Sequence, residues 1–202
     1  MNPIKPDAPS CERNRDPILT LLRPHFADRH HVLEIGSGTG QHAVYFAAAM
    51  PHLRWQTSDR VACHAGIRAW IDESGLANVL PPIELDVAGC WPTTRYDAIF
   101  TSNTLHIISA AQVEALFAAL PAVMSDDARL AVYGPFNEQG RYTSPSNGEF
   151  DAMLKARDPL SGLRDIEWVD ALAQQSGLRL IEDRAMPANN RGLVWQRVAA
   201  AS

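Results

Sequence analysis

The chain has 202 residues, of which 46% are hydrophobic, and its formal net charge at pH 7 is −5. This length suits one domain with a substantial core, and the acidic balance argues against binding to the phosphate backbone of nucleic acid. The three cysteines stand far apart without metal-ligand spacing, and no apolar run is long enough to span a bilayer. We therefore expect a single domain over residues 1–202, without a metal, in the reduced cytoplasm.

The first predicted element is a helix that follows a flexible leader. Residues 1–12 contain Pro3, Pro6 and Pro9 and lack the apolar core of a signal peptide. Asp16 and Pro17 are typical of the N-cap and first position of a helix, and the apolar residues from Ile18 to Leu22 follow at once.

The stretch Val32–Gln41 is the most specific pattern in the chain. A short apolar run ends at Glu34-Ile35, and then Gly36, Gly38 and Gly40 alternate with small polar residues before an apolar helical pattern. Glycine is required where the backbone takes a positive φ or where a ligand lies against it. A strand, a glycine turn and a helix in this order predict a nucleotide site.

The glycine spacing separates the kinds of nucleotide site. The dinucleotide fingerprint places its third glycine where Gln41 stands, and a phosphate-binding Walker loop needs a Gly-Lys-Ser/Thr tripeptide that is absent. A nucleophile elbow needs glycine at Ile35. An acidic strand end followed by Gly-x-Gly-x-Gly instead resembles motif I of the class I S-adenosylmethionine-dependent methyltransferases. The resemblance implies S-adenosylmethionine as cofactor and assigns Glu34, Gly36, Ser37, Gly38 and Gly40 to its binding.

The second predicted strand, residues 53–58, ends at Asp59. This carboxylate follows the glycine turn by about 20 residues, where an acid that binds the ribose hydroxyls is expected. The alternative role is an N-cap for the next helix, residues 62–74, which Gly75 ends. Arg60 borders the adenine or is simply solvated.

The next two strands carry further cofactor candidates. The third strand, residues 83–85, ends at Asp86-Val87, and the resemblance implies that Asp86 binds the adenine amino group while Val87 packs on the ring. Asp86 as an ordinary loop acid is the alternative. The fourth strand, residues 96–101, leads into a loop that would lie beside the sulfonium and that contains Asn103 and His106.

His106 is the first candidate for a general base, because an ordinary imidazole pKa of about 6.5 suits proton removal near neutrality. A packed or solvated loop histidine is the competing interpretation. Glu138 and Tyr142 are further candidates for the base. The resemblance also makes the N-terminal segment a lid over the methionine end of the cofactor, so Arg13 and Asn14 become substrate-side candidates; a solvated helix cap is the alternative.

Beyond a helix over residues 110–124 and a fifth strand over residues 128–133, the chain enters a long polar stretch. Residues 134–165 are predicted to form a substrate-side cap insertion with one short helix, since a segment of this length with little core content is usually functional or disordered. Asn137 and Tyr142 are its substrate-side candidates. Two strands over residues 178–185 and 192–198 end the chain, joined by a turn in which Asn189 and Asn190 either line the acceptor or only supply turn geometry.

This alternation predicts an α/β fold with a mostly parallel sheet and helices on both faces, and the short last turn makes the final strand antiparallel. That arrangement is similar to the Rossmann-like, seven-stranded class I methyltransferase fold. The Glu12-Arg13-Asn14 leader, the Gly134-Pro135-Phe136 exit and the Met186–Asn190 turn further resemble an uncharacterised branch, a domain-of-unknown-function group.

The sequence thus predicts a methyltransferase that acts on an unidentified small-molecule acceptor, without nucleic-acid or membrane partners. A non-catalytic protein of the same fold is the second hypothesis, because fold does not determine function. A nicotinamide-dependent oxidoreductase is the third. The sequence does not reveal the acceptor or the oligomeric state.

Overall fold

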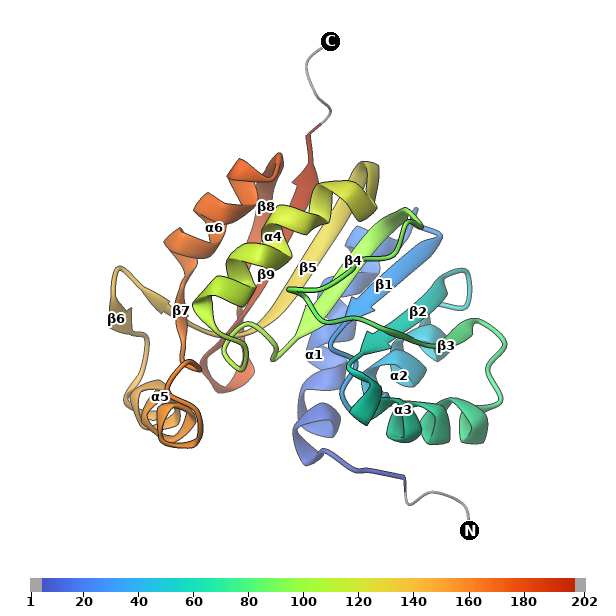
Figure 1. The fold of residues 1–202 in the computed structure, drawn as a ribbon, viewed down its shortest axis with the longest axis horizontal. Coiled ribbons are helices and arrows are strands. Elements are labelled where there is room, and N and C mark those ends of the chain that lie inside the picture. Colours follow the sequence, from blue (N-terminus) through green and yellow to red (C-terminus); the bar gives the residue numbers. More distant parts are fainter. Residues whose placement is uncertain (1–4, 199–202) are drawn as a thin grey trace.

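The computed structural model describes residues 5–198, in which one sheet carries helices on both faces (Figure 1). The helices are α1 (Pro9–Phe26), α2 (Gln41–Ala49), α3 (Val61–Ser74), α4 (Ala110–Val123), α5 (Pro145–Arg157), α6 (Ile166–Gln175) and the 3-10 turn η1 (Pro187–Asn189). The strands are β1 (His31–Ile35), β2 (Arg54–Asp59), β3 (Val79–Glu84), β4 (Tyr96–Ser102), β5 (Met124–Glu138), β6 (Arg141–Tyr142), β7 (Arg164–Asp165), β8 (Leu178–Met186) and β9 (Asn190–Arg197).

Seven strands form the sheet in the order β3-β2-β1-β4-β5-β9-β8, and the two-residue strands β6 and β7 pair with the end of β5. Strands β1 to β5 are parallel to one another, whereas β9 runs antiparallel to both β5 and β8. The predicted α/β fold with one reversed strand is therefore confirmed. The strand order reverses beside β1, so the crevice between β1 and β4 is where such sheets bind ligands.

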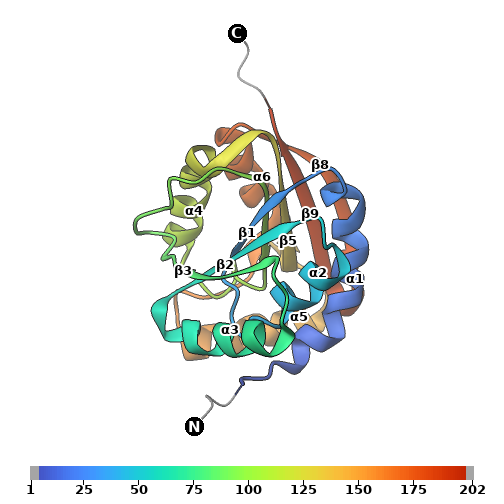
Figure 2. The same ribbon diagram turned by 90° about the vertical axis from the view of Figure 1, so that its right-hand side faces the viewer.

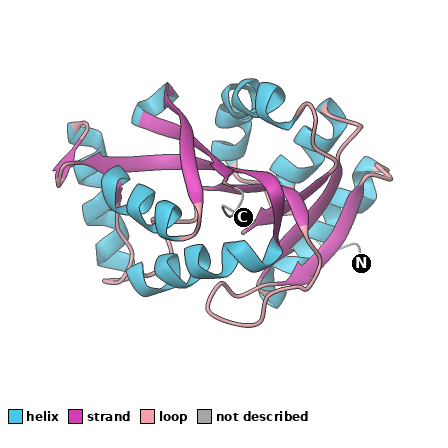
Figure 3. Ribbon diagram, turned by 90° about the horizontal axis from the view of Figure 1, so that it is seen from above, coloured by secondary structure: helices cyan, strands magenta, loops and turns pink. Residues whose placement is uncertain are grey.

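The helices form two layers that cover opposite faces of the sheet (Figures 2 and 3). Alternate residues of each strand point to opposite faces, so Leu33 and Ile35 of β1 join the core beneath α4 and α6, while Val32 joins the core beneath α1 and α2. The connection between β3 and β4 has no helix, and its Leu85, Val87 and Trp91 pack against the α4 side instead.

The N-terminal prediction needs correction. The first helix begins at Pro9 rather than at Asp16, so residues 9–12 belong to α1 and are not a flexible leader. Residues 5–8 lie along α3 and α2: the Trp70 indole donates to Pro6 O at 2.7 Å, and Ala8 N donates to Gln41 Oε1 at 2.7 Å. The first four residues lie outside the described part. Proline is tolerated in the first turn of a helix, which is why Pro9 can start α1.

The long stretch after the fifth strand is more ordered than its composition predicts. Strand β5 continues to Glu138, and the single helix predicted in this stretch, α5, has 13 residues rather than being short. Ser144 caps α5 by accepting a hydrogen bond from Asn147 N at 3.1 Å. In Figure 1, α5 lies beyond the carboxyl ends of the strands, where ligands of this fold bind.

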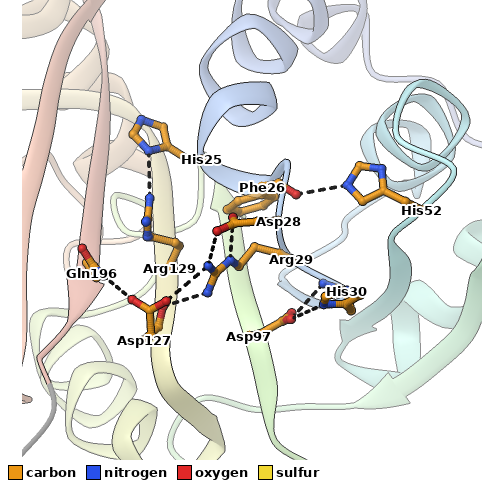
Figure 4. Close-up of polar contacts among 10 residues, drawn as sticks. All are labelled: His25, Phe26, Asp28, Arg29, His30, His52, Asp97, Asp127, Arg129 and Gln196. Carbon is orange, nitrogen blue, oxygen red and sulfur yellow. Dashed lines mark hydrogen bonds and ion pairs between the residues drawn. The ribbon is translucent and has the colours of Figure 1, made fainter.

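At the opposite edge of the sheet, a buried arginine joins the end of α1 to the start of β5 (Figure 4). Arg29 donates to the Asp28 carboxylate at 2.6 and 2.9 Å and to Asp127 O at 2.9 Å. Its hydrogen bonds with Asp28 lower the pKa of that carboxyl to about 2. This polar network lies away from the carboxyl edge, so we assign it to the scaffold.

Within residues 5–198, no helix combines the length and apolar character needed to cross a membrane.

Candidate functional site

The three glycines between β1 and α2 all have positive φ, at 72°, 59° and 92° for Gly36, Gly38 and Gly40. A Cβ on Gly36 would lie 2.8 Å from Thr104 Oγ1, and one on Gly40 would lie 3.0 Å from the backbone of Ile67. A Cβ on Gly38 would meet nothing within 4 Å. The outer glycines therefore permit close packing of the turn, and the middle one leaves space for a ligand.

The backbone amides of Gly38 and Gly40 in this turn already have acceptors. Gly38 N donates to Asp59 Oδ2 at 2.8 Å, and Gly40 N donates to Ser37 O at 2.9 Å. Asp59 Oδ1 accepts from Arg60 N at 2.7 Å. The N-cap of α3 is Arg60 and it makes no side-chain capping bond, so the alternative role of Asp59 as the helix N-cap is wrong. A carboxylate beside the middle glycine matches the position predicted for a ribose acid.

Glu34 lies behind the turn. It is 2% exposed, and its Oε2 accepts hydrogen bonds from Ser37 Oγ at 2.9 Å and from the Trp55 indole at 3.1 Å. Burial raises the pKa of Glu34 to about 7, despite these two bonds, which favour the charged form. By bonding both Ser37 and Trp55, Glu34 anchors the glycine turn to β2.

A cavity of about 430 Å³ opens at the carboxyl ends of β1, β2 and β4. Its wall includes seven of the ten predicted cofactor residues: Gly36, Gly38, Asp59, Arg60, Asp86, Val87 and Asn103. The other three, Glu34, Ser37 and Gly40, are absent from that wall among the described residues. The structure therefore brings together most of the predicted cofactor site and assigns the remainder to its support.

The cavity is acidic. Asp59, Asp86 and Asp158 contribute carboxylates to its wall, against the single guanidinium of Arg60 among the charged side chains described there. At distances of a few ångströms, negatively charged carboxylates attract a positively charged ligand and repel a negatively charged one. The wall therefore favours a cationic ligand over a polyanionic one.

Sequence reasoning missed several residues of the wall, among them Cys63, Ile107, Ile108, Gln112 and Asp158. Ile107 and Ile108 could have been found, since they directly follow His106 in the loop after β4. Asp158 carries no local signal because it lies more than fifty residues further along the chain. It reaches the cavity only because the segment after α5 folds back over the β4–α4 loop.

The loop after β4 begins with a strained residue. Asn103 has a φ of 54°, a conformation that asparagine tolerates better than most residues, and its N donates to Tyr133 O at 2.8 Å. A Cβ placed on Gly134 of β5 would lie 3.6 Å from His106 Nδ1 and 3.8 Å from Asn103 Oδ1. These two polar atoms therefore both lie beside Gly134, and the space left by its missing side chain is here called the hollow above Gly134.

His106 is 5% exposed, and its ring lies 5.4 Å from the Phe150 ring in an edge-to-face arrangement. Burial, together with the nearby Arg164 charge, lowers the pKa of His106 to about 4. The ordinary pKa on which the general-base hypothesis relied does not apply here. A neutral imidazole at pH 7 is a weak proton acceptor but a competent hydrogen-bonding group.

The predicted substrate-side residues do not gather at the cavity: within the described chain its wall contains none of Arg13, Asn14, Asn137, Tyr142, Asn189 and Asn190. Arg13 is exposed on α1, and Asn14 Oδ1 lies 2.7 Å from His42 Nε2 between α1 and α2.

Two further substrate-side candidates, Tyr142 in β6 and Asn190 at the start of β9, make hydrogen bonds within the scaffold. The Tyr142 hydroxyl donates to Asp151 Oδ2 at 2.7 Å. Asn190 Nδ2 donates to Pro187 O at 3.0 Å, which supports the turn-geometry interpretation for that residue. By contrast, Asn137 Oδ1 is buried without a hydrogen-bond partner in the described structure.

Asn189 makes its hydrogen bonds to helix α5 and does not line the cavity. Its Nδ2 donates to Ser146 Oγ at 3.2 Å, and its carbonyl accepts from Asn147 Nδ2 at 3.2 Å. Within residues 5–198, no group of three or more His, Cys, Asp or Glu side chains could hold a metal ion.

The sheet order, the glycine turn and the acid at the end of β2 define the class I S-adenosylmethionine-dependent methyltransferase fold. An O-methyltransferase family protein from Burkholderia thailandensis superposes on this chain with a TM-score of 0.79 at 16% identity. The match covers 94% of this chain and 60% of the Burkholderia protein. The chain belongs to the family described as "Protein of unknown function (DUF938)", whose model matches residues 5–197. This membership confirms the predicted uncharacterised branch.

Two further solved structures have the same fold. An O-methyltransferase family 2 protein from Planctomyces limnophilus, in complex with apigenin, has a TM-score of 0.75 at 16% identity and covers 84% of this chain and 51% of its own. Human N-acetylserotonin methyltransferase, in complex with SAM, has a TM-score of 0.76 at 13% identity. The match covers 93% of this chain and 52% of the human protein. The chain therefore spans about half to three fifths of the length of these three proteins.

Proposed function

We propose that this protein is an S-adenosylmethionine-dependent methyltransferase that acts on a small-molecule acceptor. The observation that carries the proposal is the acidic cavity beside a glycine turn whose amides are already bonded. Gly38 N is held by Asp59 and Gly40 N by Ser37 O, so neither amide is free to bind a pyrophosphate. The fold of the solved methyltransferases supports the same conclusion.

The residues present fit this cofactor. Asp59 would accept the ribose hydroxyls, Asp86 and Val87 would contact the adenine, and Gly38 and Asn103 would border the methionine part. The sulfonium of the cofactor supplies an activated methyl group when it is bound. The cavity carboxylates attract its net positive charge, whereas the bonded amides of Gly38 and Gly40 leave two fewer donors for the pyrophosphate of a dinucleotide. This contrast disfavours the nicotinamide-dependent alternative.

In this proposal, residues of the chain orient the acceptor but do not remove a proton from it. Methyl transfer is an in-line displacement, and correct placement of the two reactants accounts for much of such a rate. Asn103 Oδ1 and His106 Nδ1 face the hollow above Gly134, where a hydroxyl or amine of the acceptor could hydrogen-bond. The low pKa of His106 favours this orienting role over proton removal.

The cofactor assignment is tested by calorimetry on the full chain with S-adenosylmethionine, its demethylated product and NAD. We expect binding of the first two and none of NAD. Gly38→Val should abolish binding, because the side chain would strain a backbone φ of 59° and enter the cavity. Strong NAD binding without a response to the methyl donor would overturn the proposal.

Catalysis is tested separately by following the demethylated product during incubation with panels of small hydroxylated and amine acceptors. Turnover on any member is the expected result. Tight cofactor binding without turnover on a broad panel would favour the non-catalytic hypothesis.

A further inference from the structure

The segment that follows α5 and ends with the first residue of β7, residues 158–164, is here called the linker. It bonds four consecutive carbonyls of the loop after β4. Arg164 Nε donates to Leu105 O at 3.2 Å, and Gly162 N donates to His106 O at 2.9 Å. Ser161 Oγ donates to Ile107 O at 2.6 Å, and Arg164 Nη2 donates to Ile108 O at 2.6 Å. The linker therefore holds the whole backbone of residues 105–108.

One carboxylate on α5 holds the linker in turn. Asp151 is 2% exposed, and its Oδ1 accepts from Leu163 N at 2.7 Å. Its Oδ2 accepts from Tyr142 Oη at 2.7 Å and from Lys155 Nζ at 2.6 Å. A buried carboxylate is tolerated only when its oxygens are bonded in this way. Burial alone would raise the pKa of Asp151, but these three hydrogen bonds lower it below its ordinary value.

The linker passes very close to this carboxylate. Gly162 has a φ of 151°, and a Cβ on it would lie 2.9 Å from Asp151 Oδ1. A glycine is therefore needed where the linker crosses α5. The residue before Asp151, Phe150, packs edge-to-face on the His106 ring. Helix α5 thus covers His106 directly through Phe150 and indirectly through the linker.

We propose that Asp151 is a positioning residue, which holds the linker and thereby fixes the loop that presents His106 to the acceptor. This inference rests on the proposed function, which makes the hollow above Gly134 the acceptor side of the site. Asp158, at the start of the same linker, lines the cofactor cavity. The linker that Asp151 holds at Leu163 thus borders both parts of the site. Its position matters because a displacement of about 1 Å can reduce such a rate about a hundredfold.

The test is a pH titration of the histidine ring signals by NMR on the full chain labelled in histidine. In the wild type, His106 should titrate near a pKa of about 4. Asp151→Asn should raise this pKa by about one unit or more, because a loosened loop exposes the imidazole to water. Arg164→Lys should do the same. It keeps the positive charge, so its effect would reflect the lost hydrogen bonds rather than lost repulsion.

Asp97→Asn is the matched control. Asp97 accepts hydrogen bonds from His30 N at 2.8 Å and from His31 N at 2.7 Å at the opposite edge of the sheet. Its substitution should lower stability but leave the His106 titration unchanged. A general loss of stability would therefore be distinguished from a displaced loop.

The positioning role is overturned if His106 titrates as in the wild type in both Asp151→Asn and Arg164→Lys, or if Asp97→Asn shifts it equally. If Asp151→Asn does not fold, Arg164→Lys decides the question. Calorimetry of the wild type with S-adenosylmethionine separates the two proposals. A protein without affinity for that cofactor would refute the proposed function, whereas the titration would still report whether Asp151 positions the loop.

Discussion

Asp59 joins two functions in one side chain, since it bonds the amide of Gly38 and lies in the cavity wall. Its partners are backbone N–H groups, which leave lone pairs of both carboxylate oxygens available for a ligand. A ribose would therefore meet a carboxylate that is already oriented.

Asp59→Ala should weaken S-adenosylmethionine binding by about 1.5–3 kcal/mol, or about tenfold to a hundredfold, because hydrogen bonds to a charged acceptor are lost. Calorimetry measures the affinity, and a thermal melt serves as the control for folding. The melting temperature should change little, since the bonds from Gly38 N and Arg60 N to Asp59 are exposed and water can replace them. Unchanged affinity would show that the ribose is held elsewhere.

At the scale of elements, α1 packs so closely on β9 that only glycine fits at the contact. A Cβ on Gly192 would lie 2.5 Å from Leu21 Cδ2, and Leu21 is fully buried. This close approach brings α1 against the sheet over Tyr133, the β5 residue that pairs with Gly192. The position of α1 therefore depends on a residue near the other end of the chain.

Gly192→Ala should lower the free energy of unfolding by about 1–3 kcal/mol, the usual effect of overpacking a core. Chemical denaturation measures this change. In a Leu21→Val background, which removes the clashing methyl, the same substitution should be clearly less destabilising. Equal losses in both backgrounds would mean that the helix adjusts without strain.

At the scale of the whole molecule, buried titratable groups with opposite pKa shifts shape the dependence of stability on pH. Burial lowers the pKa of His42 and of His106 from 6.5 to about 4, so the stability that their neutral forms provide is present above pH 6.5 and is lost as pH falls through 4. Glu34 is shifted from 4.5 to about 7, so its contribution is present below pH 4.5 and is lost as pH rises through 7.

Glu34→Gln isolates the contribution of Glu34 to the pH dependence of stability, because both histidines are present in the variant and in the wild type. Glutamine still offers an acceptor to Ser37 and Trp55 but cannot ionise. The stability of the variant relative to the wild type should therefore increase between pH 4.5 and 8, by up to roughly 3 kcal/mol. Unfolding by urea at a series of pH values measures this difference. A difference that does not vary with pH would contradict the raised pKa of Glu34.

Local signals in the sequence were sufficient for the parallel sheet, the reversed last strand and most of the residues that meet at the cavity. A glycine turn after an apolar strand and an acid at the next strand end are short-range patterns, and parallel strands bring their carboxyl ends to one edge whatever the remaining residues are. The start of α1 was misplaced because prolines at its first turn resemble those of a loop. The extent of α5 was missed because its polar composition concealed a capped helix.

The environment of His106, by contrast, was decided only by tertiary structure. His106 looked like an ordinary titrating histidine in the sequence, and its low pKa arises from burial beneath Phe150 and from the Arg164 charge, both supplied by a segment about fifty residues away. Asp158 enters the cofactor cavity by the same long-range contact. Sequence patterns report how a residue relates to its neighbours in the chain, whereas desolvation and charge depend on which distant segments pack against it.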